Sequence, residues 1–265
     1  MARTAPIRLI RNEFELQDLV ELSGRDATLM ERDFALMTII AGLVTEYGDA
    51  LCFKGGFVLR HVHGHERFSK DIDATRINPP KNKLDSAAVA DAIRRSGMRN
   101  LMSLNPGTPA TDTGRSLDFA SIRYTGPLGS GLVSVEVSYR EDVIEVPQLV
   151  AVGEPYYEPF LIPVLTLNEI VAEKLRALAQ RDRPTDLSDI AMILLEDTID
   201  ERRVRELAAK KFELVKAGDH RRRIEDTISA MAGQYDAAVS AVAPDAPDYA
   251  TASRILLSRL PTLLP

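Results

Sequence analysis

Cysteine is almost absent from the sequence, and its scarcity excludes several classes of protein. Cys52 is the only cysteine in 265 residues, so no intrachain disulfide can form, and the usual zinc sites of combined histidine and cysteine are excluded. Cys52 lies in the apolar stretch 50–53, where an inert buried thiol is the simplest interpretation. We therefore expect a protein of a reducing compartment, the cytoplasm.

Long hydrophobic runs and an excess of basic residues are also missing. Residues 1–6 lead into charged residues without an apolar segment, and no later run approaches a membrane span, so we expect neither secretion nor membrane insertion. A net charge of -6 argues against a protein whose whole surface binds nucleic acid. Basic groups at 202–205, 210–211 and 220–223 are interleaved with acidic residues, so solvated helix faces and local binding patches both stay open.

The hydrophobic pattern changes its period along the chain. The composition, with 45% hydrophobic and 27% charged residues, is that of a folded globular protein. Stretches of helical and of strand spacing alternate before residue 164, and only helical spacing remains after Leu167. We predict an α+β fold, in which residues 1–164 form a mixed sheet with flanking helices and residues 165–265 form an all-helical domain.

The predicted elements follow from this pattern. Helices are predicted over residues 13–22, 28–47, 57–63 and 83–95, and strands over 50–53, 68–76, 101–104, 117–124 and 133–139. In the second part, helices are predicted over 168–180, 185–195, 201–215, 220–242 and 246–260.

Two carboxylates stand two residues apart in the predicted strand 68–76. Side chains at i and i+2 of a strand point to the same face, so Asp71 and Asp73 would lie roughly 6–7 Å apart at their Cα atoms. Mg²⁺ binds through a few hard oxygen ligands together with substrate phosphates, which these residues could supply. Taken alone, the pair is more typical of solvent-facing or capping residues.

A glycine turn precedes this strand. Lys54 ends the apolar stretch, and Gly55 and Gly56 separate it from a predicted helix. Glycines let the backbone approach a phosphate, and Lys54 would add a positive charge for a triphosphate. The alternative is a tight turn that needs glycine for its own geometry.

Further charged residues could complete the site. Glu136 lies on the polar face of the predicted strand 133–139 and is a candidate third metal ligand, although an ordinary exposed glutamate fits the pattern nearly as well. Asp186 and Asp189 share a helix face, with Lys174 on the preceding helix. An interhelical ion pair without catalytic meaning is the simplest interpretation of this second group.

The chain resembles the AbiEii-type nucleotidyltransferase toxins of bacterial toxin–antitoxin and phage-defence systems. The similarity is carried by four stretches that match in order and spacing, 30–34, 53–60, 67–73 and 167–189. The resemblance implies a DNA polymerase β-like nucleotidyltransferase core followed by a helical domain. It also implies Mg²⁺ as cofactor, an NTP as co-substrate, an RNA acceptor for which tRNA is the leading candidate, and a cognate antitoxin.

The resemblance also implies roles for individual residues. Asp71, Asp73, Lys174 and Asp189 would be catalytic; Lys54, Gly55, Gly56, Ser69, Arg181 and Asp186 would bind the nucleotide; and Asp71, Asp73 and the candidate Glu136 would hold metal. Two alternatives stay open: transfer to a small molecule such as an antibiotic, for which the acidic pI of about 5.4 suits a cationic acceptor, and a non-catalytic nucleotide-binding module.

Overall fold

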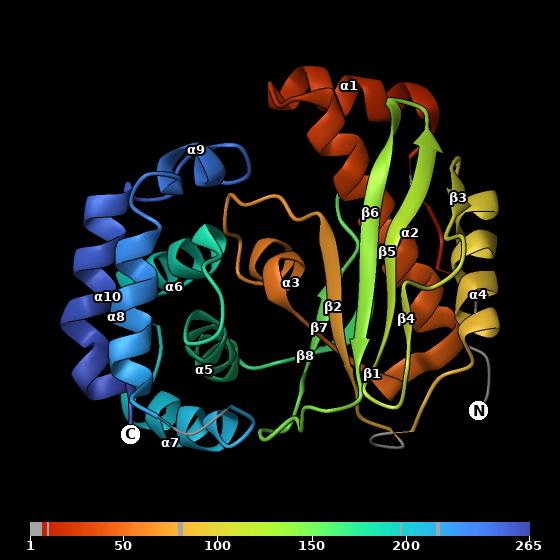
Figure 1. Cartoon of the computed structure of the whole chain (residues 1–265). Helices are drawn as coiled ribbons and strands as arrows, with labels where there is room; N and C mark the ends of the chain where they lie inside the picture. The colour runs from red at the N-terminus through yellow and green to blue at the C-terminus, as the bar shows by residue number, and fades with distance from the viewer. Residues whose placement is uncertain (1–6, 10, 79–81, 197, 216–217) are drawn as a thin grey trace. The chain divides into compact units, whose positions relative to one another are not determined.

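The computed structural model describes residues 7–9, 11–78, 82–196, 198–215 and 218–265 (Figure 1). Contacts divide the chain into two compact units. Unit 1 takes in the described residues up to His63 with Phe68–Val143 and Pro147–Val164, and unit 2 comprises Gly64–Arg67, Ile144–Val146 and Leu165–Pro265. Residues 1–6, to which the prediction about targeting applies, lie outside the described residues. No helix in the described ranges has the length and apolar character needed to cross a membrane.

Unit 1 is built on one mixed sheet of eight strands. The order is β3-β5-β6-β2-β1-β8-β7, with β4 paired to β5. β2 runs parallel to β6 and β1 parallel to β8, while the other pairs are antiparallel. The strands are β1 (Leu51–Lys54), β2 (Asp71–Arg76), β3 (Ser103–Asn105), β4 (Thr111–Asp112), β5 (Ser116–Gly126), β6 (Gly129–Ser138), β7 (Gln148–Val152) and β8 (Phe160–Val164).

The longer helices of unit 1 begin at side chains that accept backbone hydrogen bonds. The helices of this unit are α1 (Glu13–Ser23), α2 (Ala27–Tyr47), the short 3-10 helix η1 (Gly48–Ala50), α3 (Gly55–His61) and α4 (Ser86–Arg99). Asp26 caps α2 and Asp85 caps α4, each through its carboxylate. α2 and α4 pack closely, because a Cβ at Gly42 would lie 2.5 Å from the Cβ of Ser96 (Figure 1).

Alternation along the central strands separates a buried face of the sheet from a polar one. Ile72 and Ala74 of β2 are buried, as are Val133, Val135 and Val137 of β6, while the residues between them are more exposed. Because side chains alternate along a strand, the polar residues share the opposite face. Asp71 and Asp73 lie on that face.

Unit 2 is helical throughout its main segment. Its helices are α5 (Leu167–Leu178), α6 (Pro184–Glu196), α7 (Glu201–Phe212), α8 (His220–Ala230), α9 (Tyr235–Ser240) and α10 (Tyr249–Leu263). The buried amino group of Lys211 lies 2.7 Å from Glu169 Oε1 and 2.9 Å from Glu173 Oε1. Glu169 also accepts the backbone N–H groups of Ile144 and Glu145, and so attaches that short segment to unit 2.

Several predicted elements differ from the observed ones. Residues 148–164 contain β7 and β8, which the sequence did not predict, and the strand predicted from residue 68 begins only at Asp71. The single helix predicted over 220–242 is divided by a turn that contains Gly233, since glycine weakens a helix interior. Several basic residues of α7 and α8 form ion pairs: Arg203 with Glu145 and Glu206, Lys211 with Glu169 and Glu173, and Arg221 with Glu225. These pairs favour the interpretation as solvated and packed helix faces.

Candidate nucleotide site

Three neighbouring strands place acidic side chains on the polar face of the sheet in unit 1. Asp73 of β2 is in register with Glu136 of β6, which is in turn in register with Asp118 of β5. Asp71 is in register with Ser134, whose hydroxyl donates to Asp71 Oδ1 at 2.6 Å. We call Asp71, Asp73, Glu136 and Asp118 the acidic face.

Asp118 is the member of the acidic face that sequence reasoning missed. Burial raises the pKa of Asp118, and the charge of Asp71 raises it further. Glu136 is the most open member, with 48% of its side chain exposed and Arg140 at 4.0 Å. The strand pattern alone shows that residue 118 is polar, but only the register brings it beside Glu136 and near Asp71.

The acidic face has the ligand chemistry of a divalent-cation site. Burial raises the pKa of Asp118 most and the charge of Asp71 adds to it, and a hard cation bound through carboxylate oxygens would offset the repulsion between these like charges. As the described side chains stand, no three histidine, cysteine or acidic residues are gathered closely enough to enclose a metal ion. Asp71 and Asp73, with Glu136 or Asp118, are the residues that would hold one.

The glycine turn lies directly against this acidic face. Lys54 at the end of β1 is in register with Asp73, and Gly55 follows with a φ of +74°, a conformation that disfavours side chains. A Cβ at Gly55 would lie 2.5 Å from Asp73 Oδ2. Glycine is therefore required at position 55 both by the backbone and by the neighbouring carboxylate. The next residue, Gly56, is buried in the first turn of α3.

Lys54 is held by an acidic residue that the sequence did not single out. Its amino group forms an ion pair with Glu141, and the side chains are only 11% and 7% exposed. The ion pair keeps the ammonium group at the glycine turn but shares its charge with Glu141 before any phosphate arrives. No local pattern marks Glu141, because it follows β6 and meets Lys54 only in the folded chain.

Ser69 organises the start of β2. Its hydroxyl accepts the backbone N–H of Asp71 at 3.3 Å and donates to the Asp71 carbonyl at 3.0 Å. The side chain is buried and engaged with the backbone just ahead of the two aspartates. This hydroxyl lies near the acidic strand, and its predicted contact with a nucleotide stays a prediction.

A second group of predicted residues meets in unit 2. The amino group of Lys174 lies 2.6 Å from Asp189 Oδ2 and 3.1 Å from Asp186 Oδ1. Arg181 pairs with Asp186 at 3.0 Å, and Arg67 pairs with Asp189 at 2.6 Å. We call these five residues the charged cluster, of which Arg67 was not predicted.

Burial and ion pairing compete within the charged cluster. Burial works to lower the pKa of Lys174, but the carboxylates of Asp189 and Asp186 outweigh it and raise that pKa. Burial likewise works to raise the pKa of Asp186, and Lys174 and Arg181 outweigh it and lower that pKa. Lys174 and Asp186 are therefore held in their charged forms. The interhelical ion pair expected from the sequence is present.

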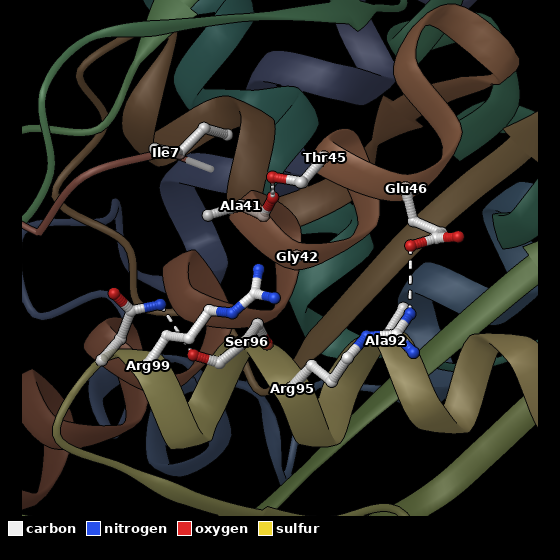
Figure 2. Close-up of a pocket in the computed structure, with 10 residues that line it drawn as sticks. Ile7, Ala41, Gly42, Thr45, Glu46, Ala92, Arg95, Ser96 and Arg99 are labelled. Carbon is white, nitrogen blue, oxygen red and sulfur yellow. Dashed lines mark hydrogen bonds and ion pairs between the residues drawn. The ribbon is translucent and has the colours of Figure 1, made fainter. Parts of the chain in front are cut away.

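A pocket on unit 1 lies apart from all of these residues. Figure 2 shows it between α2 and α4, where Arg95 pairs with Glu46 and the amide of Asn100 donates to Ser96. Its cavity volume of about 30 Å³ is close to the share of one water molecule in the liquid and far below that of ligand pockets. None of its lining residues belongs to the predicted site.

Comparisons with known proteins agree with the fold. Similar solved structures include the nucleotidyltransferase toxin MenT4 of Mycobacterium tuberculosis, which is 21% identical with a TM-score of 0.68 over 96% of this chain and 89% of that chain. They also include JHP933 of Helicobacter pylori, which is 16% identical with a TM-score of 0.59 over 89% of this chain and 91% of that chain. No curated protein matches the chain. The predicted α+β class, a nucleotidyltransferase mixed sheet with flanking helices and a helical C-terminal part, is confirmed.

A family model described as "Nucleotidyl transferase AbiEii toxin, Type IV TA system" matches residues 40–258. The match takes in the glycine turn, the acidic face and the charged cluster. Such a family implies a nucleotide as substrate and an antitoxin as partner. The chain therefore belongs to the AbiEii family of nucleotidyl transferase toxins of toxin–antitoxin systems.

Proposed function

We propose that the chain is a Mg²⁺-dependent toxin that transfers a nucleotide from an NTP to an RNA acceptor, with tRNA as the acceptor to test first. The observation that carries the proposal is the contact between Gly55 and Asp73, which sets a phosphate-binding turn beside carboxylates suited to metal. Such a juxtaposition matches what nucleotidyl transfer needs, because the triphosphate and the metal must meet at the same phosphate oxygens.

Each group has a part in this proposal. The Lys54 amino group and the backbone of Gly55 and Gly56 would bind the triphosphate, while Asp71 and Asp73, with Glu136 or Asp118, would hold the metal. Mg²⁺, when bound, supplies positive charge to the reacting phosphoryl group. In the transfer, a hydroxyl oxygen of the acceptor forms a bond to the α-phosphorus and its proton passes to solvent, while the bond from the α-phosphorus to the bridging oxygen breaks and pyrophosphate leaves.

The charged cluster has a place in the proposal through the family resemblance. Lys174 would contact the nucleotide phosphates, and Asp189 would be the catalytic acidic residue of the last of the four stretches, 167–189. Arg181 and Asp186 would assist nucleotide binding. Lys174 already faces two carboxylates, so a phosphate would have to exchange with one of them.

The test is a transfer assay with Mg²⁺, each of the four labelled NTPs and total tRNA. We expect label in tRNA with the wild-type chain, and almost none with Asp73→Asn. Asp91→Asn is the matched control, since it removes an exposed carboxylate of α4 whose ion pair with Arg94 contributes little. Undiminished transfer by Asp73→Asn, or no transfer to any RNA by the wild-type chain, would contradict the proposal.

A small cationic acceptor, such as an aminoglycoside-like antibiotic, is the second candidate. The pI of about 5.4 and the net charge of -6 favour attraction of a cation over a polyanion. Label transferred to the drug, with resistance gained and no growth inhibition on overexpression, would favour this candidate. For either acceptor we propose a cytoplasmic location, consistent with a single buried free cysteine.

A further inference from the structure

We propose that Asp33 is a positioning residue of the nucleotide site: its buried carboxylate fixes α3, and with it the glycine turn, relative to the acidic strand β2. This inference rests on the proposed function, because it concerns the same triphosphate-binding turn. Asp33 lies on α2, far from the turn in sequence, and belongs to no element of the acidic face.

α3 needs an anchor because it is short. The helix runs over seven residues, Gly55–His61, and helices of this length do not persist without tertiary contacts. Its first residues form the glycine turn, and its last two supply the anchor. Arg60 Nε donates to Asp33 Oδ1 at 3.1 Å, and His61 Nε2 lies 2.9 Å from the same oxygen. One carboxylate therefore anchors the far end of α3.

The carboxylate itself is rigidly held. Only 2% of Asp33 is exposed, and the hydroxyl of Tyr156 donates to Oδ2 at 3.1 Å. Burial works to raise the pKa of Asp33, but His61, Arg60 and Tyr156 outweigh it and bring the pKa down to about 2. Asp33 is thus a fixed negative charge under all conditions in which the chain would work.

The same contacts reach the acidic strand. The guanidinium of Arg60 lies 3.9 Å from the ring centre of Phe68, a cation–π distance. Phe68 is followed by Ser69, whose hydroxyl is bonded to the backbone of Asp71. Asp33 thereby connects, through Arg60 and Phe68, the helix that carries the glycine turn to the residue that begins the acidic strand.

Asp33→Asn keeps the size of the side chain and removes its charge. Arg60 and His61, with side chains only 10% and 8% exposed, would then lack the anion that holds them. We expect KM for the preferred NTP, in the presence of Mg²⁺, to rise about tenfold or more, because a shift of around an ångström in a positioning group is enough for such a loss.

Thr38→Val is the matched control. Thr38 lies on the same helix and is fully buried, and its hydroxyl bonds the Phe34 carbonyl at 2.8 Å and the Tyr157 hydroxyl at 2.7 Å, but not α3. We expect both variants to lower Tm, and only Asp33→Asn to raise KM. Equal KM values in the two variants would show a merely structural role and overturn the inference.

A double-mutant cycle tests whether Asp33 acts through Arg60. Arg60→Gln should raise KM by a similar factor and add little in the Asp33→Asn background. Fully additive effects on KM would overturn the inference.

A second variant serves if Asp33→Asn fails to fold. Arg60→Lys keeps the positive charge but loses the planar contact with Phe68, so we expect it to raise KM. An unchanged KM in Arg60→Lys would overturn the inference. A wild-type chain that binds none of the four NTPs overturns the proposed function together with this inference, whereas wild-type binding with unaffected variants overturns the inference alone.

Discussion

The acidic face of unit 1 and the charged cluster of unit 2 both gather carboxylates, but their charges are balanced differently. In unit 1, Asp71 is bonded to a neutral hydroxyl and raises the pKa of its neighbour Asp118. In unit 2, Asp189 stands between Lys174 and Arg67, and Asp186 between Lys174 and Arg181. The acidic face would gain stability from a bound cation, whereas the charged cluster holds itself together without one.

Neutralising one carboxylate of the acidic face gives the largest expected effect on activity. We expect Asp73→Asn to lower the rate of nucleotidyl transfer by about 10²- to 10³-fold, since a charge-stabilising group at the reacting phosphate is lost. We expect Tm to fall less than in a variant of the charged cluster, whose aspartates are buried. A fall in Tm as large as that of a variant of the charged cluster would contradict the contrast between the two regions.

The same change in the charged cluster should act on stability. Asp189→Asn leaves the buried amino group of Lys174 and the guanidinium of Arg67 without their shared anion. We expect a loss of about 3 kcal/mol in the free energy of unfolding, measured by urea denaturation. Asp182→Asn removes an exposed carboxylate from the preceding turn and should change that free energy by no more than about 0.5 kcal/mol.

The pH dependence of stability sharpens the contrast. Ion pairs lower the folded-state pKa of Asp186, so its contribution is present above the ordinary aspartate pKa and is lost as pH falls through the lowered value. Asp186→Asn should therefore be less stable than the wild type at pH 7, by about 1–2 kcal/mol, and should approach it in acid. A difference that stays constant from pH 7 to pH 2 would contradict this assignment.

Neutralising Asp118 is expected to give the smallest change in stability, and a gain where the variants of the charged cluster give a loss. Its pKa is raised, so the penalty for its charge grows as pH rises above the ordinary aspartate value. Asp118→Asn should be slightly more stable than the wild type at pH 7, by less than about 1 kcal/mol, and should need a higher Mg²⁺ concentration for half-maximal activity. An unchanged Mg²⁺ requirement would leave Glu136 as the candidate third ligand.

Local patterns in the sequence predicted the parts of the site that local geometry determines. Asp71 and Asp73 share a face because strands alternate, and Lys174, Asp186 and Asp189 meet because helix spacing and one turn bring them together. The order of strand, glycine turn and helix is visible for the same reason. These features depend on residues close in sequence.

The residues that sequence reasoning missed depend on contacts between distant segments. Asp118 reaches the acidic face through strand register, Glu141 meets Lys54, and Arg67 meets Asp189 across 122 positions of the chain. β7 and β8 were missed because each spans only five residues, and Pro163 interrupts the pattern of β8. Periodicity carries no information about which distant segments pair.

The acidic face depends on the absence of a side chain at Gly55. The space that a methyl group would fill is occupied by Asp73 Oδ2, at 2.5 Å from the position of that absent Cβ. The substitution Gly55→Ala would therefore disturb metal binding as well as phosphate binding. It would displace the carboxylate of Asp73 in a chain whose acidic residues are all intact. The absence of a side chain at Gly55 leaves room for the carboxylate of Asp73, so a residue with a Cβ at position 55 is incompatible with the present position of Asp73.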